Sequence, residues 1–249
     1  MKNYNLNFID SRLLFRHVRE TVAQYRFDID LQRFNSSLVD PIKLTFDSLV
    51  YDRSMEEVIE NEITRQLDKS NNNHIGYFHQ NIFKYIGGEE WRVPEQGFDI
   101  VNDSKQIFVE LKNKHNTMNA PSSESTYIKM ANTIMKKPDA TCMLVEIIAK
   151  QSQNKPWEKK IDKEKISDER IRRVSADQFY RMVTGIDDAF AQLCKVLPSV
   201  IRDVVNSLDL PRSSNTVVSE LSDQSSNILN SLFLFTFKRY EGFKEFDVK

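Results

Sequence analysis

The sequence predicts an α/β fold in which helices flank a mixed central sheet of about five strands. Ile107, Val109 and Leu111 alternate with Phe108, Glu110 and Lys112, which is the period-two pattern of a strand. Residues 142–149 form a nearly continuous apolar run, which is typical of a central strand covered on both faces. Apolar residues recur at helical spacing over 54–69 and 186–208. With 249 residues, 40 % of them hydrophobic, the chain can build a core of ordinary size, so we predict a single domain.

The charge balance limits how the chain can bind a polyanion. Charged residues make up 29 % of the sequence and nearly cancel, which leaves a net charge of −1. Such a chain does not attach to nucleic acid by bulk charge. Positive charge that serves binding must therefore be concentrated in one cleft.

The cysteines and the hydropathy pattern predict a cytoplasmic protein. Cys142 lies in an apolar strand and Cys194 on an apolar helix face, so we expect buried free thiols rather than a disulfide. No stretch approaches the roughly 18 consecutive apolar residues of a membrane-spanning helix. The N-terminus also lacks the apolar run of a signal peptide.

The first part of the chain is predicted to be helical. Residues 1–50 form a mostly helical, partly irregular lead-in, and a clearer helix follows over 54–69. Ser54 and Glu57 have the spacing of a capping box at its start. Glu62 falls in the middle of the apolar face of this helix, where a carboxylate needs a partner. A metal ion and an arginine are both open as that partner.

A second helix is predicted over 74–86. A polar turn over 69–73 separates it from the first, and Gly87 with Gly88 ends it. Gln80 lies near its midpoint.

The chain is organised around a predicted hairpin whose second strand is the alternating segment. A turn-rich tetrad, 102–105, joins the two strands. An even-numbered loop here pairs Asp99 with Phe108, and because paired residues share a face, Asp99 lies on the face of Glu110 and Lys112. Diagonal neighbours across such a pair are roughly 7–8 Å apart.

Two carboxylates at this spacing can converge on one divalent cation. Mg²⁺ at a phosphate site typically takes one or two carboxylates plus water, and a neighbouring lysine orients the water or stabilises the developing charge. Asp99 with Glu110 and Lys112 is therefore a candidate phosphodiester-hydrolysis site. The spacing alone leaves open a solvated strand face with a Glu–Lys pair. A similar triplet at 158–160 lies in a polar run without strand pattern.

The wider sequence resembles the PD-(D/E)XK nuclease superfamily. Residues 97–101 (GFDIV) and 109–119 (VELKNKHNTMN) carry the likeness, and within the superfamily they resemble type II restriction endonucleases that cut GGNCC, the AsuI-type specificity. Residues 75–83 and 170–185 support it, and the likeness covers roughly residues 55–200. The proline–aspartate pair of the superfamily is broken here, because Phe98 precedes the aspartate.

The resemblance implies a type II site-specific deoxyribonuclease. Such an enzyme hydrolyses both strands of duplex DNA at a short palindromic site, here GGNCC, with Mg²⁺ held by Asp99 and Glu110, and leaves 5′-phosphates. It also implies a homodimer and a cognate DNA methyltransferase as functional partner. Superfamily members often add a polar residue from a helix, a role for which Glu62 and Gln80 compete. The alternatives are a repair or recombination nuclease of the same fold and a DNA-binding module without catalysis.

Two regions are candidates for DNA contact. A polar loop over 113–125 leaves the catalytic strand, and its amides, hydroxyls and cations suit phosphates and base edges. The candidates in this loop are Asn113, Lys114, His115, Asn116, Asn119 and Ser122. Arg172 and Arg173 are candidates for lining the cleft from a second region.

The predicted domain has a core over about 55–150 and a helical, DNA-contacting region over about 165–208. A helix over 125–135 carries Tyr127 and Lys129 on its exposed side. Residues 209–227 are rich in Ser and Asn and are predicted to be a flexible connector. The apolar segment 232–240 is predicted to be a strand.

Overall fold

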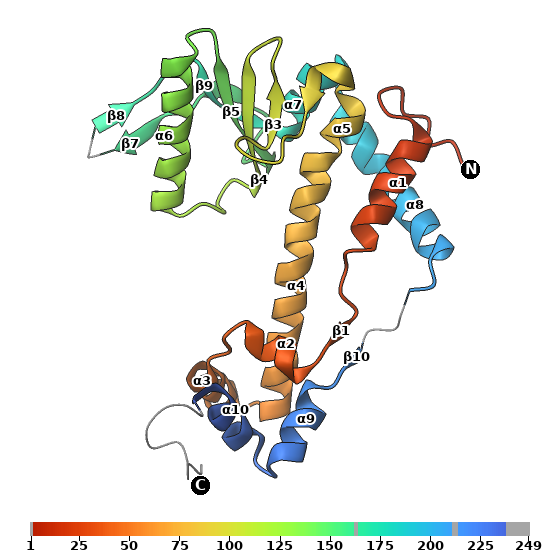
Figure 1. The fold of residues 1–249 in the computed structure, drawn as a ribbon, viewed down its shortest axis with the longest axis vertical. Helices are drawn as coiled ribbons and strands as arrows, with labels where there is room; N and C mark the ends of the chain where they lie inside the picture. The colour runs from red at the N-terminus through yellow and green to blue at the C-terminus, as the bar shows by residue number, and fades with distance from the viewer. Residues whose placement is uncertain (1, 162–163, 211–213, 238–249) are drawn as a thin grey trace. The chain divides into compact units, whose positions relative to one another are not determined.

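The computed structural model describes residues 2–161, 164–210 and 214–237 (Figure 1). Two compact units are present. The first is formed by the chain up to Ala23 and by Ile75–Leu208, and the second by Gln24–His74 and by the chain from Asp209 onward. Within the described ranges, none of the helices combines the length and apolarity that a membrane crossing requires.

The first unit is built on a six-stranded mixed sheet, which confirms the predicted mixed sheet. The strands, in spatial order, are β2 (Trp91–Arg92), β3 (Ile100–Asn102), β4 (Ile107–Lys114), β5 (Thr141–Ile148), β9 (Ile171–Ser175) and β6 (Asn154–Pro156). Strands β4, β5 and β9 are parallel to one another, and the outer strands are antiparallel to their neighbours. Because β5 lies in the middle of the sheet, it is apolar on both faces.

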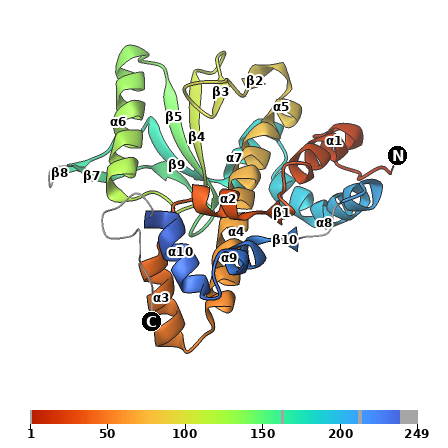
Figure 2. The ribbon, with the colours of Figure 1, turned by 60° about the horizontal axis from the view of Figure 1, so that its bottom comes forward.

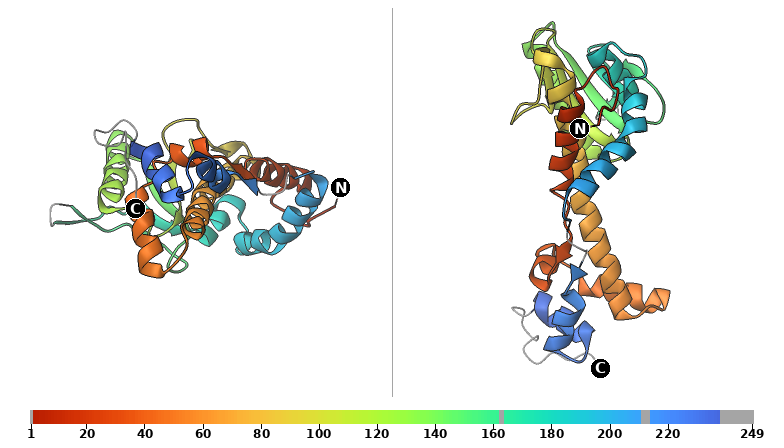
Figure 3. Two further views of the ribbon diagram at one scale, coloured as in Figure 1. Left: turned by 90° about the horizontal axis from the view of Figure 1, so that it is seen from below. Right: turned by 90° about the vertical axis from the view of Figure 1, so that its right-hand side faces the viewer.

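Helices cover both faces of this sheet (Figures 1 and 3). On one face α6 (Ala120–Lys136) packs against Phe108 and Leu144, while Val109 and Val145 face the opposite core. That second core is closed by α1 (Ser11–Val22), α5 (Phe83–Ile86), α7 (Ala176–Thr184) and α8 (Ala189–Ser207). A short 3-10 helix, η1 (Gly88–Glu90), follows α5, and the hairpin of β7 (Lys159–Ile161) and β8 (Glu164–Ile166) lies beside α6 (Figure 2).

The second unit is mainly helical. Its elements are β1 (Asp28–Ile29), α2 (Leu31–Ser36), α3 (Pro41–Tyr51), the first part of α4 (Met55–Asn81), β10 (Ser214–Asn215), α9 (Val217–Gln224) and α10 (Ile228–Phe237). Its core includes Phe34, Leu44, Ile59 and Leu221. The segment predicted to be a flexible connector thus contains α9, which contributes Leu221 to this core.

The strand predicted over 232–240 is wrong for its described part. Residues up to Phe237 belong to helix α10, and 238–240 lie outside the described residues. The side chain of Asn227 accepts a hydrogen bond from the backbone of Asn230 (3.2 Å), which caps the first turn. The alternating apolar residues have strand propensity, but a cap and a helical neighbourhood override it.

Helix α4 is continuous where a polar turn was predicted over 69–73. The capping box at its start is confirmed, because Ser54 and Glu57 exchange side-chain to backbone bonds of 3.2 Å. No glycine or proline interrupts the helix before Gly76. Asn72 bonds Asp68 one turn earlier (2.8 Å), so polar residues that resemble a turn support the helix here.

Two histidines of the first unit, the buried His17 and the partly buried His79, make its stability depend on pH. Nε2 of His17 lies 2.9 Å from the Phe78 carbonyl, and the two rings stack. Burial and, to a smaller extent, the nearby His17 lower the pKa of His79 to about 4. An unfolded histidine titrates near its usual pKa of about 6.5, so protons bind preferentially to the unfolded chain below that pH. The stabilisation is therefore complete above pH 6.5 and is lost as the pH falls toward 4.

We expect the free energy of unfolding to fall by up to about 3 kcal/mol between pH 7 and pH 4 through His79. His79→Gln removes this titration, so the variant should lose correspondingly less stability over the same range. Urea unfolding of both proteins at a series of pH values measures the difference. Equal pH slopes for the two proteins would contradict this account.

Candidate active site

The β3–β4 hairpin sets the geometry of the site. Val101 pairs with Phe108 and Ile100 with Val109, so the predicted pairing of Asp99 with Phe108 is wrong by two residues. Continuing the observed register by one residue places Asp99 opposite Glu110. Because the shift is even, the predicted face is kept.

The turn explains the shift in register. Asn102 is fully buried and extends the ladder by one pair, opposite Ile107. Its side-chain oxygen accepts hydrogen bonds from the Ser104 hydroxyl and the Lys105 backbone, both 2.9 Å. Gln106, predicted as the first residue of the second strand, lies in the turn with a φ of 48°. Asparagine side chains that bond the backbone ahead of them favour such turns.

Asp99 is held from two sides. Its Oδ2 accepts a hydrogen bond from the Leu111 backbone N–H (2.7 Å), and Gln80 on α4 donates its side-chain amide to the Asp99 carbonyl (3.2 Å). Burial raises the pKa of the Asp99 carboxyl, and the negative charge of Glu110 raises it further, against the effect of the Leu111 hydrogen bond and the nearby lysines. The two carboxylates therefore repel each other across the hairpin.

Glu110 is buried and lies between two lysines. Lys112, from the same strand, places its Nζ 3.6 Å from Oε2. Lys129, from α6, forms an ion pair with Oε1. The structure thus brings together Asp99, Glu110 and Lys112, three of the four residues predicted for catalysis, but not Glu62.

Lys129 is the residue that sequence reasoning missed. It was predicted on the exposed side of its helix, but its ammonium also donates to the Gly97 carbonyl (2.8 Å) and lies 4.3 Å from the centre of the Phe98 ring. Tyr127, predicted on the same exposed side, is buried against Trp157. No pattern within the helix marks Lys129, because its position depends on how α6 sits on the sheet.

The donor set fits a hard divalent cation. Two carboxylates, Asp99 and Glu110, face each other, and burial already disfavours the charge of Asp99. Mg²⁺ commonly binds to one or two carboxylates with water completing its shell. In the part of the chain that the structure describes, no three His, Cys, Asp or Glu side chains gather as an all-protein metal cage.

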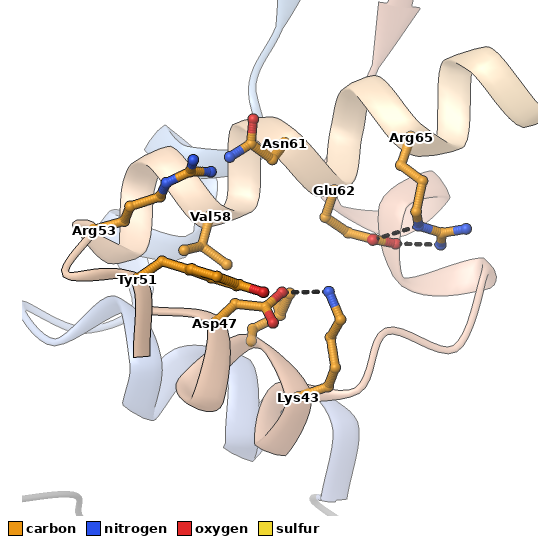
Figure 4. A pocket seen from close by; sticks show the side chains of 9 residues that line it. Lys43, Asp47, Tyr51, Arg53, Val58, Asn61, Glu62 and Arg65 are labelled. Carbon is orange, nitrogen blue, oxygen red and sulfur yellow. Dashed lines mark hydrogen bonds and ion pairs between the residues drawn. The ribbon is translucent and has the colours of Figure 1, made fainter. Parts of the chain in front are cut away.

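The two helix-borne candidates differ in their surroundings. Glu62 belongs to the second unit, where its carboxylate accepts a hydrogen bond from Arg65 Nε (2.6 Å; Figure 4). It also accepts one from the side-chain amide of Gln66 (3.0 Å). Burial acts to raise its pKa, but these hydrogen bonds and the charge of Arg65 outweigh burial and lower it. This is the buried glutamate paired with arginine. Gln80 instead contacts Asp99 directly.

The polar loop after β4 is shorter than predicted. Strand β4 runs to Lys114 and so includes Asn113, and α6 begins at Ala120. Asn119 is the N-cap of α6 and accepts a hydrogen bond from the Ser122 backbone (2.9 Å). Among the candidates, Lys114, Asn116, Asn119 and Ser122 are exposed.

Three other candidates, His115, Arg172 and Arg173, are bound to neighbouring parts of the protein. The His115 backbone N–H bonds the Ile148 carbonyl (3.0 Å), and its carbonyl accepts from Arg173 (3.1 Å). Arg173 also pairs with the buried Glu146 through Nε (2.8 Å). Arg172 bonds Asn154 twice, at 2.6 and 2.8 Å. The contact of these residues with DNA stays a prediction.

Comparison with known proteins identifies the family. The family model for the Eco47II restriction endonuclease matches residues 6–206. The chain belongs to this family. It is 32 % identical to the type II restriction enzyme Sau96I of Staphylococcus aureus, over 90 % of this chain and 91 % of that enzyme. It is 29 % identical to the type II restriction enzyme Eco47II of Escherichia coli, over 81 % of this chain and 88 % of that enzyme.

Family membership makes the chain a type II site-specific deoxyribonuclease that acts on DNA. The predicted enzyme class is thereby confirmed. The matched range includes the β3–β4 hairpin with both carboxylates. The hairpin is therefore part of what this chain shares with the family.

The repulsion between the two carboxylates predicts a stability gain on removing one charge. Because the folded state raises the pKa of Asp99, the ionised group is less favourable folded than unfolded and lowers stability above its usual pKa. In EDTA at pH 7.5, Asp99→Asn should therefore unfold at a higher temperature than the wild type. A melting temperature below that of the wild type would show that the negative charge of Asp99 does not lower the stability of the fold.

Proposed function

We propose that the chain is an Mg²⁺-dependent restriction endonuclease with an active site of the PD-(D/E)XK type, formed by Asp99, Glu110 and Lys112. One observation carries this proposal: the hairpin register places both carboxylates on one sheet face with the Lys112 ammonium 3.6 Å from Glu110. Membership in a family of type II restriction enzymes supports it.

Each residue has a distinct role in hydrolysis. Asp99 and Glu110 are the oxygen ligands for Mg²⁺, which supplies charge neutralisation at the phosphate and lowers the pKa of water. Lys112 orients the attacking water and stabilises charge on the phosphate. Gln80 positions Asp99 through its backbone carbonyl. Glu62, which is paired with Arg65, is not needed in this arrangement.

Lys129 is a positioning residue for Glu110. Its ammonium joins Glu110 to the Gly97 carbonyl and so ties the catalytic strand to the segment that precedes Asp99. Groups that orient metal ligands typically contribute 10–100-fold to metal affinity or activity.

The target is a short palindrome, for which the resemblance implies GGNCC cut to leave 5′-phosphates. A palindrome has two-fold symmetry and is matched by a two-fold homodimer. A cognate DNA methyltransferase is the functional partner, because the host genome needs protection from this activity. The exposed Lys114 and Asn116 stand where β4 ends, next to the catalytic residues of that strand, and are the first candidates for DNA contact.

Substitution of the site residues tests the catalytic proposal. We expect Asp99→Ala, Glu110→Ala and Lys112→Ala to abolish cleavage of plasmid DNA in Mg²⁺, and Lys129→Met to slow it about 10–100-fold. The matched control is Glu158→Ala, because Glu158 pairs with Lys165 on the surface in the similar triplet outside the site. Digestion of the plasmid over time, followed by the appearance of discrete bands, gives the cleavage rates of these five variants and of the wild type.

A near wild-type rate for Asp99→Ala or Glu110→Ala would show that the site is misassigned. Discrete bands from a plasmid containing GGNCC, and their absence when those sites are removed, establish the specificity. Cleavage without a fixed pattern would contradict it.

The exposed residues after β4 have separable effects on DNA binding. Lys114→Ala should weaken binding to all duplexes alike and reduce the slope of log affinity against log salt by about one. Asn116→Ala should weaken binding to the cognate duplex by about 1–3 kcal/mol and leave unrelated duplex unaffected. Fluorescence anisotropy in the Glu110→Ala background, at two salt concentrations, measures both effects.

Equal losses on both duplexes for Asn116→Ala would assign it to backbone positioning. Asn119 needs a different substitution, because it caps α6. Asn119→Ser keeps a capping oxygen, so this variant separates a DNA contact from a loss of helix stability.

A further inference from the structure

Helix α3 exposes a row of large apolar side chains on the second unit. Ile42, Phe46 and Leu49 are 51, 64 and 77 % exposed and recur at the spacing of one helix face. Leu38 extends the row beyond the N-terminus of the helix, and Val50 flanks it at the other end. We call these five residues the α3 stripe.

The stripe lies opposite the side of α3 that the fold uses. Leu44 is buried in the core of the second unit, and α10 packs against α3. Lys43 and Asp47 form an ion pair and, with Tyr51, line a pocket of about 200 Å³ beside α4 (Figure 4). The buried side and the pocket take up other parts of the helix surface, and more than half of each stripe residue stays open to solvent within one copy.

The backbone at Leu38 presents this surface at a cost. Leu38 has a φ of 52° and is 88 % exposed. A branched apolar residue in the left-handed region is disfavoured, and placing it in water has no compensating burial within the unit. The turn that ends α2 sets this conformation, because the Leu38 backbone N–H bonds the Asn35 carbonyl (2.9 Å), and it leaves the Leu38 side chain in solvent.

The size of the stripe points to a protein interface. Its exposed side chains amount to on the order of 600 Å², at the upper limit of the largest apolar patch of an ordinary monomer. Two stripes packed together would bury roughly 1,200 Å² in total, the lower end of stable interfaces. Polar residues at its rim would add to that area.

We propose that the α3 stripe is the dimer interface and that its occupant is the α3 stripe of a second copy. An antiparallel pair of α3 helices related by a two-fold axis near Phe46 sets Ile42 of one copy against Leu49 of the other. The stripe is therefore complementary to itself, as a two-fold interface requires.

This inference rests on the homodimer in the proposed function and adds the surface that forms it. The oligomeric state of the full chain is measured by sedimentation equilibrium without DNA or metal. We expect a wild-type dimer, and at least a tenfold weaker dimer for Phe46→Glu and for Leu49→Glu. Met135→Glu is the matched control, because Met135 on α6 is 79 % exposed and lies outside the stripe.

Both stripe variants change side chains that face solvent within one copy, so their circular dichroism and melting temperature at low concentration should match those of the wild type. Dimers of unchanged affinity in both variants would overturn the assignment. A monomeric wild type would also overturn it and would leave residues 238–249, which include Phe243 and Phe246, as the next occupant to test. Since no cleavage is measured, failure of the interface is separate from failure of the nuclease proposal.

Discussion

The register between β3 and β4 decides whether Asp99 and Glu110 meet. A slip of one residue would turn Asp99 to the opposite face, where Ile100 and Val109 pack in the core. The fully buried Asn102 opposes such a slip, because its side chain closes the turn with two hydrogen bonds. A turn at the distal end of the hairpin thus fixes the geometry of a site several residues away.

The charges around the hairpin leave Lys112 and Lys129 free to pair with Glu110. Glu146 on β5 is the register neighbour of Lys112 and shares its face of the sheet. Arg173, from β9, pairs with Glu146 and so neutralises a buried carboxylate that would otherwise compete for Lys112. Lys129, which lies on α6, forms an ion pair with Glu110 from the helix that covers this face of the sheet. Two carboxylates and two lysines therefore form a compensated cluster in a chain of nearly zero net charge.

Local patterns in the sequence predicted the parts of the fold that depend on local physics. The alternation over β4, the apolar run of β5 and the capping box at Ser54 each gave the observed element. The shared face of Asp99, Glu110 and Lys112 followed from a parity argument, which is insensitive to an error of two residues in register. The prediction failed where residues distant in the sequence determine the structure. The residues of α10 favour a strand, but they form a helix that packs in a helical unit. Lys129 reaches the site only because of the way α6 packs on the sheet. The loop after β4 was predicted to be longer than it is, because the capping role of Asn119 at the start of α6 was not recognised.

In the proposed active site, Asp99 and Glu110 hold one divalent ion together. Calorimetric titration with Ca²⁺ of the wild type, Asp99→Asn, Glu110→Gln and the double variant measures their coupling directly, without DNA or cleavage. A shared ion predicts that each single substitution removes most of the affinity and that the double variant loses little more, so the effects are far from additive. Additive losses, or a single variant that binds Ca²⁺ as well as the wild type, would contradict the claim.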